Sequence, residues 1–478
     1  MLAQVKSFKF VPARIRRRVL KRNHINELPV ELLVKIFLCC LPTRTFPKPS
    51  RREAPLLLAR VCCIWRSVSL NTSQLWSQIT LEGLQSVSHR RRTPWTSESF
   101  HRFGIHEWLR RSGSSPLSFE IGRHFHIHTT TAPLLTLALQ AEAHRWKAVI
   151  LNDTCACITH ILQMLWVPGK TLMLTDIHFA DIELSAYPLT ITPNQAFPPA
   201  SQLCSICAYS ENVRLLLGSG KLHALRELRI GFFEESSSPP LVTSLSFTQF
   251  PLLEILELSF RSPPFPQYDA ATVTVVHSLQ HLQNFFFVDR VGEYLWLIDT
   301  FNTPILNALA ITSPKLGEDE GTHLSDFLLR CGGQLRRLMF HGAGGGVPWG
   351  GLTRFIQHTP MLETLCAGSP YLRRGDLMPP CPTLSQVDIL FGPYDDIMMI
   401  TVLAILSQWK CSGRLRERDP GSTVSPSVIR VHWDYLSHVL KHREVKKCIP
   451  LGLRVEPLPP QKESWWEHRL YAYLVVTN

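Results

Sequence analysis

The chain has 478 residues, too many for one ordinary compact core, so we expect two or more domains or one long repeat array. Apolar residues make up 45% of it and charged residues 18%, which excludes a chain that is disordered throughout. The net charge of +12 is uneven: residues 1–111 hold 21 basic and 6 acidic residues (net +15), and the remainder holds 29 and 32 (net −3), which argues against a nucleic-acid surface spread over the whole protein.

The cysteines and the apolar runs indicate in which cellular compartment the protein is expected. Thirteen cysteines, some of them adjacent, have neither the density nor the spacing of a disulfide framework. The N-terminus lacks the apolar core of a secretory signal, and the longest apolar stretch, 397–406, has about ten residues where a bilayer span needs about 20. We therefore expect a soluble protein of the cytoplasm or nucleus, with reduced thiols, no membrane contact and no cofactor.

Residues 1–24 are rich in basic side chains, since six of the nine positions from Arg14 to Arg22 are Lys or Arg. We interpret this segment as a flexible basic tail. Two alternatives stay open, a nuclear-import signal and a transit peptide without acidic residues.

Helix signals follow within residues 25–80. Pro29 suits the first turn of a helix that ends at Leu41-Pro42, Pro55 is expected to open a second helix, and a short third element carries Leu75 and Trp76. The two apolar stripes consist of Leu32, Leu33, Ile36 and Phe37, and of Leu58, Val61, Trp65 and Val68. So small a unit cannot bury all of these side chains, which predicts that a partner or a neighbouring domain covers them.

Residues 81–97 are predicted to be a linker, and an amphipathic helix around Trp108 is expected to end near Gly113. Beyond it, seven segments share the frame L-x-x-L-x-L or a close variant, at intervals of 22 to 29 residues. The frames begin at Leu225, Leu253, Leu282, Leu306, Leu335, Leu362 and Leu384. A short strand and a helical pattern at this period predict a leucine-rich-repeat solenoid, in which stacked repeats share one core. An ordinary α/β domain is the alternative.

Weaker copies of the frame begin at Trp146 and Leu203, with a strand-like Leu172-x-Leu174 between them, and the pattern fades beyond Ser412. We therefore expect an irregular solenoid over residues 98–478 with a C-terminal cap. The predicted fold class is α/β, with a small three-helix unit followed by a curved parallel sheet that carries helices on its convex side.

Three motifs follow one another in residues 25–77: Leu28-Pro29-x-Glu31-Leu32-Leu33-x-x-Ile36-Phe37, Val61-Cys62-x-x-Trp65-Arg66, and Leu75-Trp76. Together they resemble the F-box, most closely that of the divergent F-box proteins of mushroom-forming fungi. Those proteins also carry a phrase like the one from Trp108 to Leu117, and leucine-rich repeats beyond it. The long basic, proline-rich loop between the first two helices departs from the family pattern.

The resemblance implies a substrate receptor of an SCF-type ubiquitin ligase, not itself an enzyme. Its F-box would bind a Skp-type adaptor and, through it, a cullin, while the solenoid would bind an unidentified protein substrate. Carried over by motif, the positions at the adaptor interface or in the helix packing behind it are Leu28, Pro29, Leu32, Ile36, Phe37, Val61, Trp65 and Trp76. The structural alternative is that most of them pack against the chain's own solenoid.

Alternation within each frame places its leucines inward and the residue between the last two apolar positions outward, on the concave face. We predict that these outward residues contact the substrate: Arg229, Glu257, Phe286, Met339 and Asp388, together with Ala310 and Cys366 in the same row. Exposed Phe and Met would suit protein recognition.

Other chemistry is weakly indicated. His124, His126 and His128 share a face only if they form a strand, Cys204-x-x-Cys207 is a lone pair, and the glycine-rich turn after His341 has no matching nucleophile motif. Three other functions stay open: an F-box-like scaffold without a ligase role, a nucleic-acid-associated protein that uses the basic residues 14–22 and 90–92, and a hydrolase whose motif is not recognised.

Overall fold

The computed structural model describes residues 25, 28–42, 45–81, 104–122, 132–152, 161, 164–165, 167, 169–179, 202–209, 222–232, 247–261, 276–314, 321–341, 355–367, 381, 383–390, 395–415 and 427–458. The chain divides into two compact units. Unit 1 comprises Met1–Met164 and Gly169–Met173, and unit 2 comprises Leu165–Pro168 and Leu174–Asn478. The predicted tail (1–24) and most of the predicted linker (81–97) lie outside the described residues.

Unit 1 begins with short helical elements, which are α2 (Val30–Cys39), the 3₁₀ turn η2 (Leu58–Arg60), α3 (Cys63–Asn71) and the 3₁₀ turn η3 (Ser73–Trp76). The prediction of one helix running on from Pro55 is wrong. Cys62 is extended (φ −155°, ψ 176°), and its Sγ accepts the N–H of Trp65 at 3.4 Å, so a new helix starts after it. The backbone therefore bends at Cys62, and the stripe from Leu58 to Val68 is divided between two elements.

Three parallel strands complete unit 1. They are β1 (Gln78–Leu81), β2 (Leu117–Ile121) and β3 (Trp146–Leu151), with α5 (Ile105–Ser112), α6 (Ala132–Ala141) and the 3₁₀ turn η5 (Ala143–Arg145) between them. The predicted end of the helix around Trp108 is confirmed, since Gly113 follows α5 with a positive φ of 54° that glycine adopts readily. Ile79 pairs with Phe119, and Phe119 with Val149, so one apolar row crosses the three strands.

Unit 2 contains eleven further parallel strands of the same kind, which gives fourteen in the described part of the chain and confirms the α/β class. In order along the chain they are β4 (Asp176–Phe179), β5 (Ser205–Tyr209), β6 (Glu227–Phe232), β7 (Ile255–Phe260), β9 (Asn284–Asp289), β11 (Ala308–Thr312), β12 (Arg337–His341), β13 (Thr364–Ala367), β14 (Gln386–Ile389), β15 (Ser427–Val431) and β16 (Leu453–Pro457). Each strand pairs with the next one in this order.

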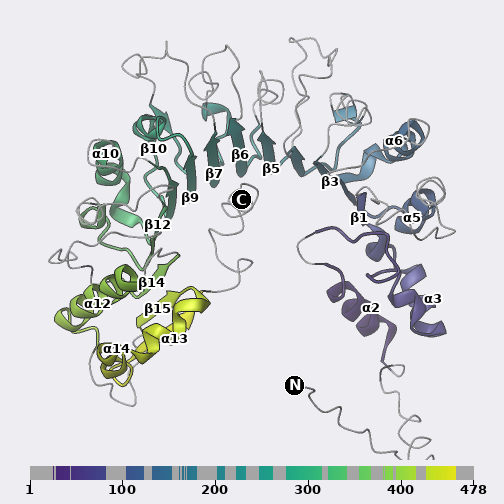
Figure 1. Cartoon of the computed structure of the whole chain (residues 1–478). Coiled ribbons are helices and arrows are strands. Elements are labelled where there is room, and N and C mark those ends of the chain that lie inside the picture. The colour runs from purple at the N-terminus through teal and green to yellow at the C-terminus, as the bar shows by residue number, and fades with distance from the viewer. Residues whose placement is uncertain are drawn as a thin grey trace, which may run out of the picture. The chain divides into compact units, whose positions relative to one another are not determined.

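The remaining elements of unit 2 lie between these strands. A separate pair, β8 (His277–Ser278) and β10 (Phe301–Asn302), runs beside the 3₁₀ turns η7 (Phe247–Gln249) and η9 (Leu295–Thr300). The helices are α10 (Gly321–Cys331, followed by the 3₁₀ turn η10, Gly332–Gln334), α12 (Asp395–Cys411), α13 (Trp433–Lys441) and α14 (Arg443–Cys448). Figure 1 shows α10 and α12 on the outer side of the curved sheet of unit 2.

Each of the seven L-x-x-L-x-L frames supplies a strand that begins two residues after its first leucine. The N–H of that leucine donates to the carbonyl three residues earlier, as in Leu306 to Thr303 (3.2 Å) and Leu335 to Gly332 (3.1 Å). The second frame position stays in register from strand to strand: Leu228, Leu256, Phe285, Leu309, Leu338, Leu365 and Val387. These side chains are buried, so stacking the strands builds one continuous core.

One prediction about the frame is wrong, and the strands continue past the point where the frame fades in the sequence. Leu172-x-Leu174 is not a strand: the repeat there starts at Leu174, and Ile177 and Phe179 of β4 occupy its other apolar positions. Beyond Ser412 the ladder does not fade, since β15 and β16 continue it with Ile429 paired to Val387 and Val455 paired to Ile429. Sequence inspection missed them because Pro426 and Gly452 stand where the frame's first leucine is expected.

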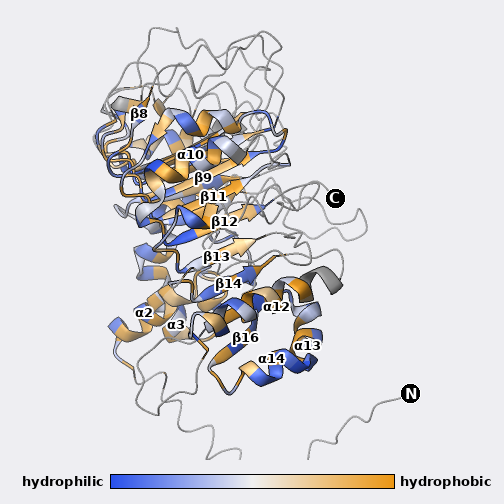
Figure 2. Ribbon diagram, turned by 90° about the vertical axis from the view of Figure 1, so that its left-hand side faces the viewer, coloured by the Kyte–Doolittle hydropathy of each residue, from blue (hydrophilic) through white to orange (hydrophobic). Residues whose placement is uncertain are grey.

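The middle strands of unit 2 are buried on both faces. Figure 2 shows the hydrophobic colour of β9 and β11. The face toward the helices holds Phe285, whose ring lies 6.2 Å from that of Phe327 on α10. Within the described residues, none of the helices has the length and hydropathy that crossing a membrane requires.

Candidate functional site: an apolar surface on α2 and α3

The helix α2 buries one side and exposes the other. Pro29 precedes it, and the Pro29 carbonyl accepts the N–H groups of Leu32 (3.0 Å) and Leu33 (3.1 Å), which starts the first turn. Leu33 and Phe37 are buried, one turn apart on the inner side. Val30, Leu32 and Ile36 are exposed, with relative accessibilities of 55%, 44% and 38%.

A second set of exposed apolar side chains lies around the start of α3. Leu57, Val61 and Ile64 are exposed, Val61 by 56%. Together with Val30, Leu32 and Ile36 they form what we call the α2–α3 surface. These six large apolar side chains, carried by α2, by the residues that flank η2 and by the first turn of α3, leave apolar area in water that is available to a partner.

The two helices are held together behind this surface. The ring of Phe37 lies 4.8 Å from that of Trp65, tilted by 55°, and Arg66 Nε donates to the Ala59 carbonyl at 2.8 Å. Trp65 itself is half-buried, and its buried Nε1 has no hydrogen-bond partner. The rings of Phe37 and Trp65 therefore fix the mutual position of the helices that carry the exposed residues.

The structure divides the eight predicted adaptor positions into three groups. Pro29, Leu32, Ile36 and Val61 are exposed, and Leu28 and Trp65 are half-buried. Phe37 and Trp76 are fully buried, which places them in the helix packing, the second of the two roles predicted for these positions. Sequence analysis missed Val30, Leu57 and Ile64, which stand outside the motifs. The sequence signal by which such residues can be found is an apolar residue on the otherwise polar side of a short helix.

Trp76 is the first residue of the earliest repeat frame, because Ile79 and Leu81 of β1 follow at the frame spacing. Its Nε1 donates to the Ser69 carbonyl at 2.8 Å, and its ring meets the edge of Trp108 at 4.9 Å. The guanidinium of Arg111 lies 4.5 Å from the centroid of the Trp76 ring. Trp76 therefore joins α3 to α5 within unit 1.

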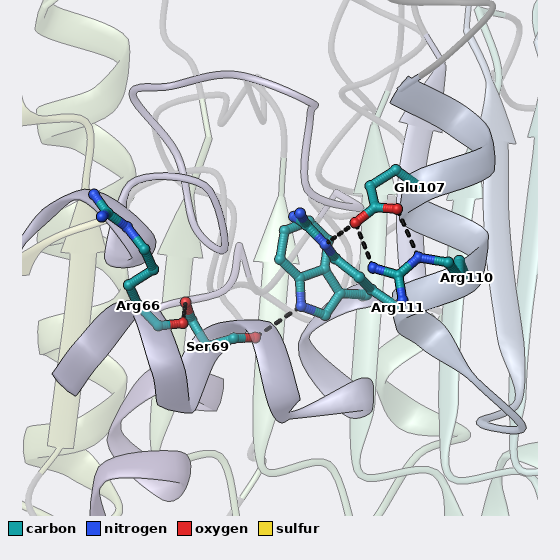
Figure 3. A network of polar contacts seen from close by, with 6 residues as sticks. Arg66, Ser69, Glu107, Arg110 and Arg111 are labelled. Carbon is teal, nitrogen blue, oxygen red and sulfur yellow. Dashed lines mark hydrogen bonds and ion pairs between the residues drawn. The ribbon is translucent and has the colours of Figure 1, made fainter. Parts of the chain in front are cut away.

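The same region holds an ion network on α5. The Glu107 carboxylate accepts from Arg110 (Nε 2.7 Å) and from Arg111 (Nε 2.8 Å), drawn as dashed lines in Figure 3. The hydrogen bond from Arg110 is the main cause that lowers the pKa of Glu107 to about 2. Glu107 thereby orients Arg111 over the face of Trp76.

The second predicted site, the outward row of the repeat frames, differs from expectation. The row exists, since Arg229, Glu257, Phe286, Ala310, Met339, Cys366 and Asp388 pair in register from β6 to β14. Phe286, Met339, Glu257 and Asp388 are buried, so the prediction that they are exposed is wrong. Neighbours about 4.8 Å away in the same row shield each side chain, and Ile255 and Leu458 pack against the apolar part.

The ends of this row are charged. Arg229, half-buried, pairs with Glu227 (Nε to Oε1 2.9 Å) and lies 3.7 Å from Glu257 Oε2. Burial acts to lower the pKa of Arg229, but the two carboxylates raise it overall. At the other end Gln386 Nε2 donates to both oxygens of Asp388, at 3.0 and 3.1 Å. The row therefore has an apolar centre between polar ends.

The described residues contain no group of three His, Cys, Asp or Glu side chains that could hold a metal ion. Cys204 is half-buried and Cys207 is buried in β5. The histidines at 124, 126 and 128 lie outside the described residues, as does most of the glycine-rich turn after His341. Comparison with protein-family models finds no match to this chain, and comparison with the curated proteins finds none either.

Proposed function

We propose that this protein is a substrate receptor of an SCF-type ubiquitin ligase, with an F-box at residues 25–80 and a leucine-rich-repeat solenoid behind it. The observation that carries the proposal is the exposed α2–α3 surface. It lies on the segment whose motifs resemble the F-box. An F-box needs such a surface because it works by presenting apolar side chains to a Skp-type adaptor.

The geometry of the two helices supports this role. Leu32 and Ile36 lie one turn apart on α2, Val61 directly follows the η2 turn, and Ile64 lies in the first turn of α3. Burying an apolar side chain at an interface hot spot contributes about 2 kcal/mol or more. A few of these residues therefore suffice for a stable complex with an apolar groove of the adaptor.

The solenoid part of the proposal rests on the register of the strands. Parallel strands paired in chain order, each opened by the same turn, form an extended sheet whose connecting loops can be varied without changing the core. Such a sheet is suited to holding a protein substrate. The catalytic step would belong to other subunits, with a cullin reached through the adaptor.

The test is co-purification of the full chain with a fungal Skp-type adaptor. The variant Leu32→Asp/Val61→Asp changes two exposed side chains, so it should fold normally, and we expect it to lose adaptor binding by about tenfold or more for each residue. The matched control is Leu329→Asp on α10, where the leucine is 68% exposed. Equal retention of the adaptor by both variants, or none by the unaltered chain, would favour a scaffold without a ligase role.

A further inference from the structure

The helices α13 and α14 lie in the most basic stretch of the chain beyond residue 111. Residues 430–454 hold six basic and two acidic residues (net +4), whereas the other residues from 112 to 478 hold 23 and 30 (net −7). The two helices pack against each other, and Figure 1 shows them beside β15 at the yellow end of the sheet. Positive charge is therefore concentrated at one place in a region that is otherwise negative.

One side of α13 faces away from the sheet. Val439 is fully buried on the inner side, and Leu436 and Leu440 are half-buried. Five exposed residues at positions i, i+1, i+4, i+5 and i+8 share the other side: Trp433, Asp434, Ser437, His438 and Lys441. Trp433 is 71% exposed, more than any other large apolar side chain of the described residues. Tryptophan is also the residue type most typical of interface hot spots.

The next helix adds three cations. They are exposed at positions i, i+3 and i+4 and so share one face of α14: Arg443, Lys446 and Lys447. The carboxylate of Glu444 is already occupied, because Oε1 accepts from Lys447 Nζ at 2.6 Å and Oε2 accepts from Lys410 Nζ at 3.2 Å.

The remaining cations are left to an outside partner. Within the described residues, Lys441, Arg443 and Lys446 have no acidic partner, and the carboxylate of Asp434 lies 3.1 Å from His432 Nδ1. We call Trp433, Lys441, Arg443 and Lys446 the α13–α14 surface. An exposed indole beside unpaired cations is complementary to a molecule that is both acidic and apolar.

The spacing of this surface indicates the size of its partner. Trp433 and Lys441 are eight residues apart on one helix, which is about 12 Å along its axis. An extended chain advances about 3.3 Å per residue, so about four residues cover this distance. One short segment can therefore place an apolar side chain on Trp433 and its carboxylates near Lys441 and Arg443.

We propose that the α13–α14 surface binds an acidic segment of a partner protein, with a large apolar residue about four positions from its carboxylates. A helix that lies on a lipid surface presents a wide apolar face, and single-stranded nucleic acid stacks on a series of aromatic side chains. The exposed side of α13 offers the single indole of Trp433, which fits one anchor residue of a peptide. The inference does not depend on the ligase role, because α13 and α14 belong to unit 2.

The test selects ligands for the full chain from a displayed library of 12-residue peptides, in which Asp or Glu fills half of the positions at random. The library is first depleted on the variant Trp433→Ala/Lys446→Glu, so that peptides bound elsewhere are removed. We expect the retained peptides to carry an aromatic residue or leucine about four positions from an acidic pair. The best of them, labelled with a fluorophore, is then titrated by fluorescence anisotropy.

Single variants separate the apolar anchor from the charge. Trp433→Ala should weaken binding of the labelled peptide about tenfold or more, and Lys446→Glu about threefold or more. Binding should also weaken as the salt concentration rises. The matched controls, which should leave binding unchanged, are Leu329→Ala at a leucine that is 68% exposed and Lys170→Glu at another exposed lysine.

Three results would overturn the proposal. The first is that no peptide survives depletion, and the second is that Trp433→Ala binds the selected peptide as well as the unaltered chain does. The third is that phosphatidylserine vesicles or a single-stranded oligonucleotide bind in a manner that depends on Trp433 while the peptides do not. Self-association of the unaltered chain that Trp433→Ala abolishes, without peptide binding, would likewise replace the proposed partner with a second copy.

Discussion

The guanidinium of Arg111 lies 4.5 Å from the ring centroid of Trp76, whose other side is fixed by the hydrogen bond from its Nε1 to the Ser69 carbonyl. Trp76 thus belongs both to the helical segment and to the first strand frame. A residue in this position couples the helices that carry the α2–α3 surface to the parallel strands of unit 1.

Replacing Trp76 with Ala should therefore destabilise unit 1 as a whole. Removing a buried tryptophan costs about 3–5 kcal/mol, because it leaves a cavity and an unpaired carbonyl. Urea unfolding followed by circular dichroism measures the loss. Trp433→Ala, at a tryptophan that is 71% exposed, should change stability by about 0.5 kcal/mol or less. A similar small effect for Trp76→Ala would contradict the coupling.

Glu107 makes the stability of unit 1 depend on pH. Its pKa is about 2 in the folded protein, mainly through the hydrogen bond from Arg110, against 4.5 as the ordinary value. A lowered carboxyl pKa stabilises the fold fully above pH 4.5, and this contribution is lost as the pH falls toward 2. Since the side chain is 40% exposed, solvent screening keeps the contribution below about 1 kcal/mol.

The variant Glu107→Gln should accordingly be slightly less stable than the unaltered chain at pH 7, and the difference should shrink below pH 4.5. Urea midpoints of the two proteins between pH 3 and 7 measure it. A difference that stays constant down to pH 3 would show that the ion network does not stabilise the fold.

Phe37 and Leu32 lie on the same helix, but we expect Phe37 to act in packing and Leu32 in binding. Phe37 is buried against Trp65, so Phe37→Ala should cost about 3–5 kcal/mol of stability. Leu32 is exposed, so Leu32→Ala should cost about 0.5 kcal/mol or less and act only on adaptor binding. Thermal unfolding of both variants, beside adaptor retention, tests this division. Equal destabilisation by the two changes would place Leu32 in the core.

Sequence reasoning worked where one local rule decides the outcome. The seven frames became strands because alternation and turn geometry are local, and Gly113 ends α5 because its φ is positive. It failed where burial depends on distant residues. Alternation placed Phe286 and Met339 on the correct face of the sheet but could not show that other atoms cover that face.

In the helical segment of unit 1, too, sequence-based prediction failed where burial depends on distant residues. The motif residues Phe37 and Leu32 look equivalent in sequence, yet one packs against Trp65 and the other is exposed. The break at Cys62 was hidden because its cause is a single extended residue within an otherwise helical stripe. Side chains outside the motif, such as Val30, were missed because no spacing rule includes them.

Among the polar residues of unit 2, Asp289 at the end of β9 is the one whose replacement we expect to destabilise the fold most. The carboxylate is fully buried and accepts three backbone N–H groups, from Val291 (3.1 Å), Gly292 (2.8 Å) and Tyr294 (2.8 Å). Gly292 has a positive φ of 81°, so these bonds hold a turn that other residues adopt with strain. Burial raises the pKa of Asp289, and the three hydrogen bonds oppose that rise.

Asp289→Ala should therefore leave three N–H groups without their acceptor and cost about 3 kcal/mol or more. Asp289→Asn keeps one oxygen acceptor and removes the buried charge, so we expect a smaller loss, about half as large. Urea unfolding of both variants measures the order of the two effects, and hydrogen exchange at Gly292 and Tyr294 should speed up most in Asp289→Ala. Equal losses for Ala and Asn would mean that the charge, and not the acceptor geometry, holds the turn.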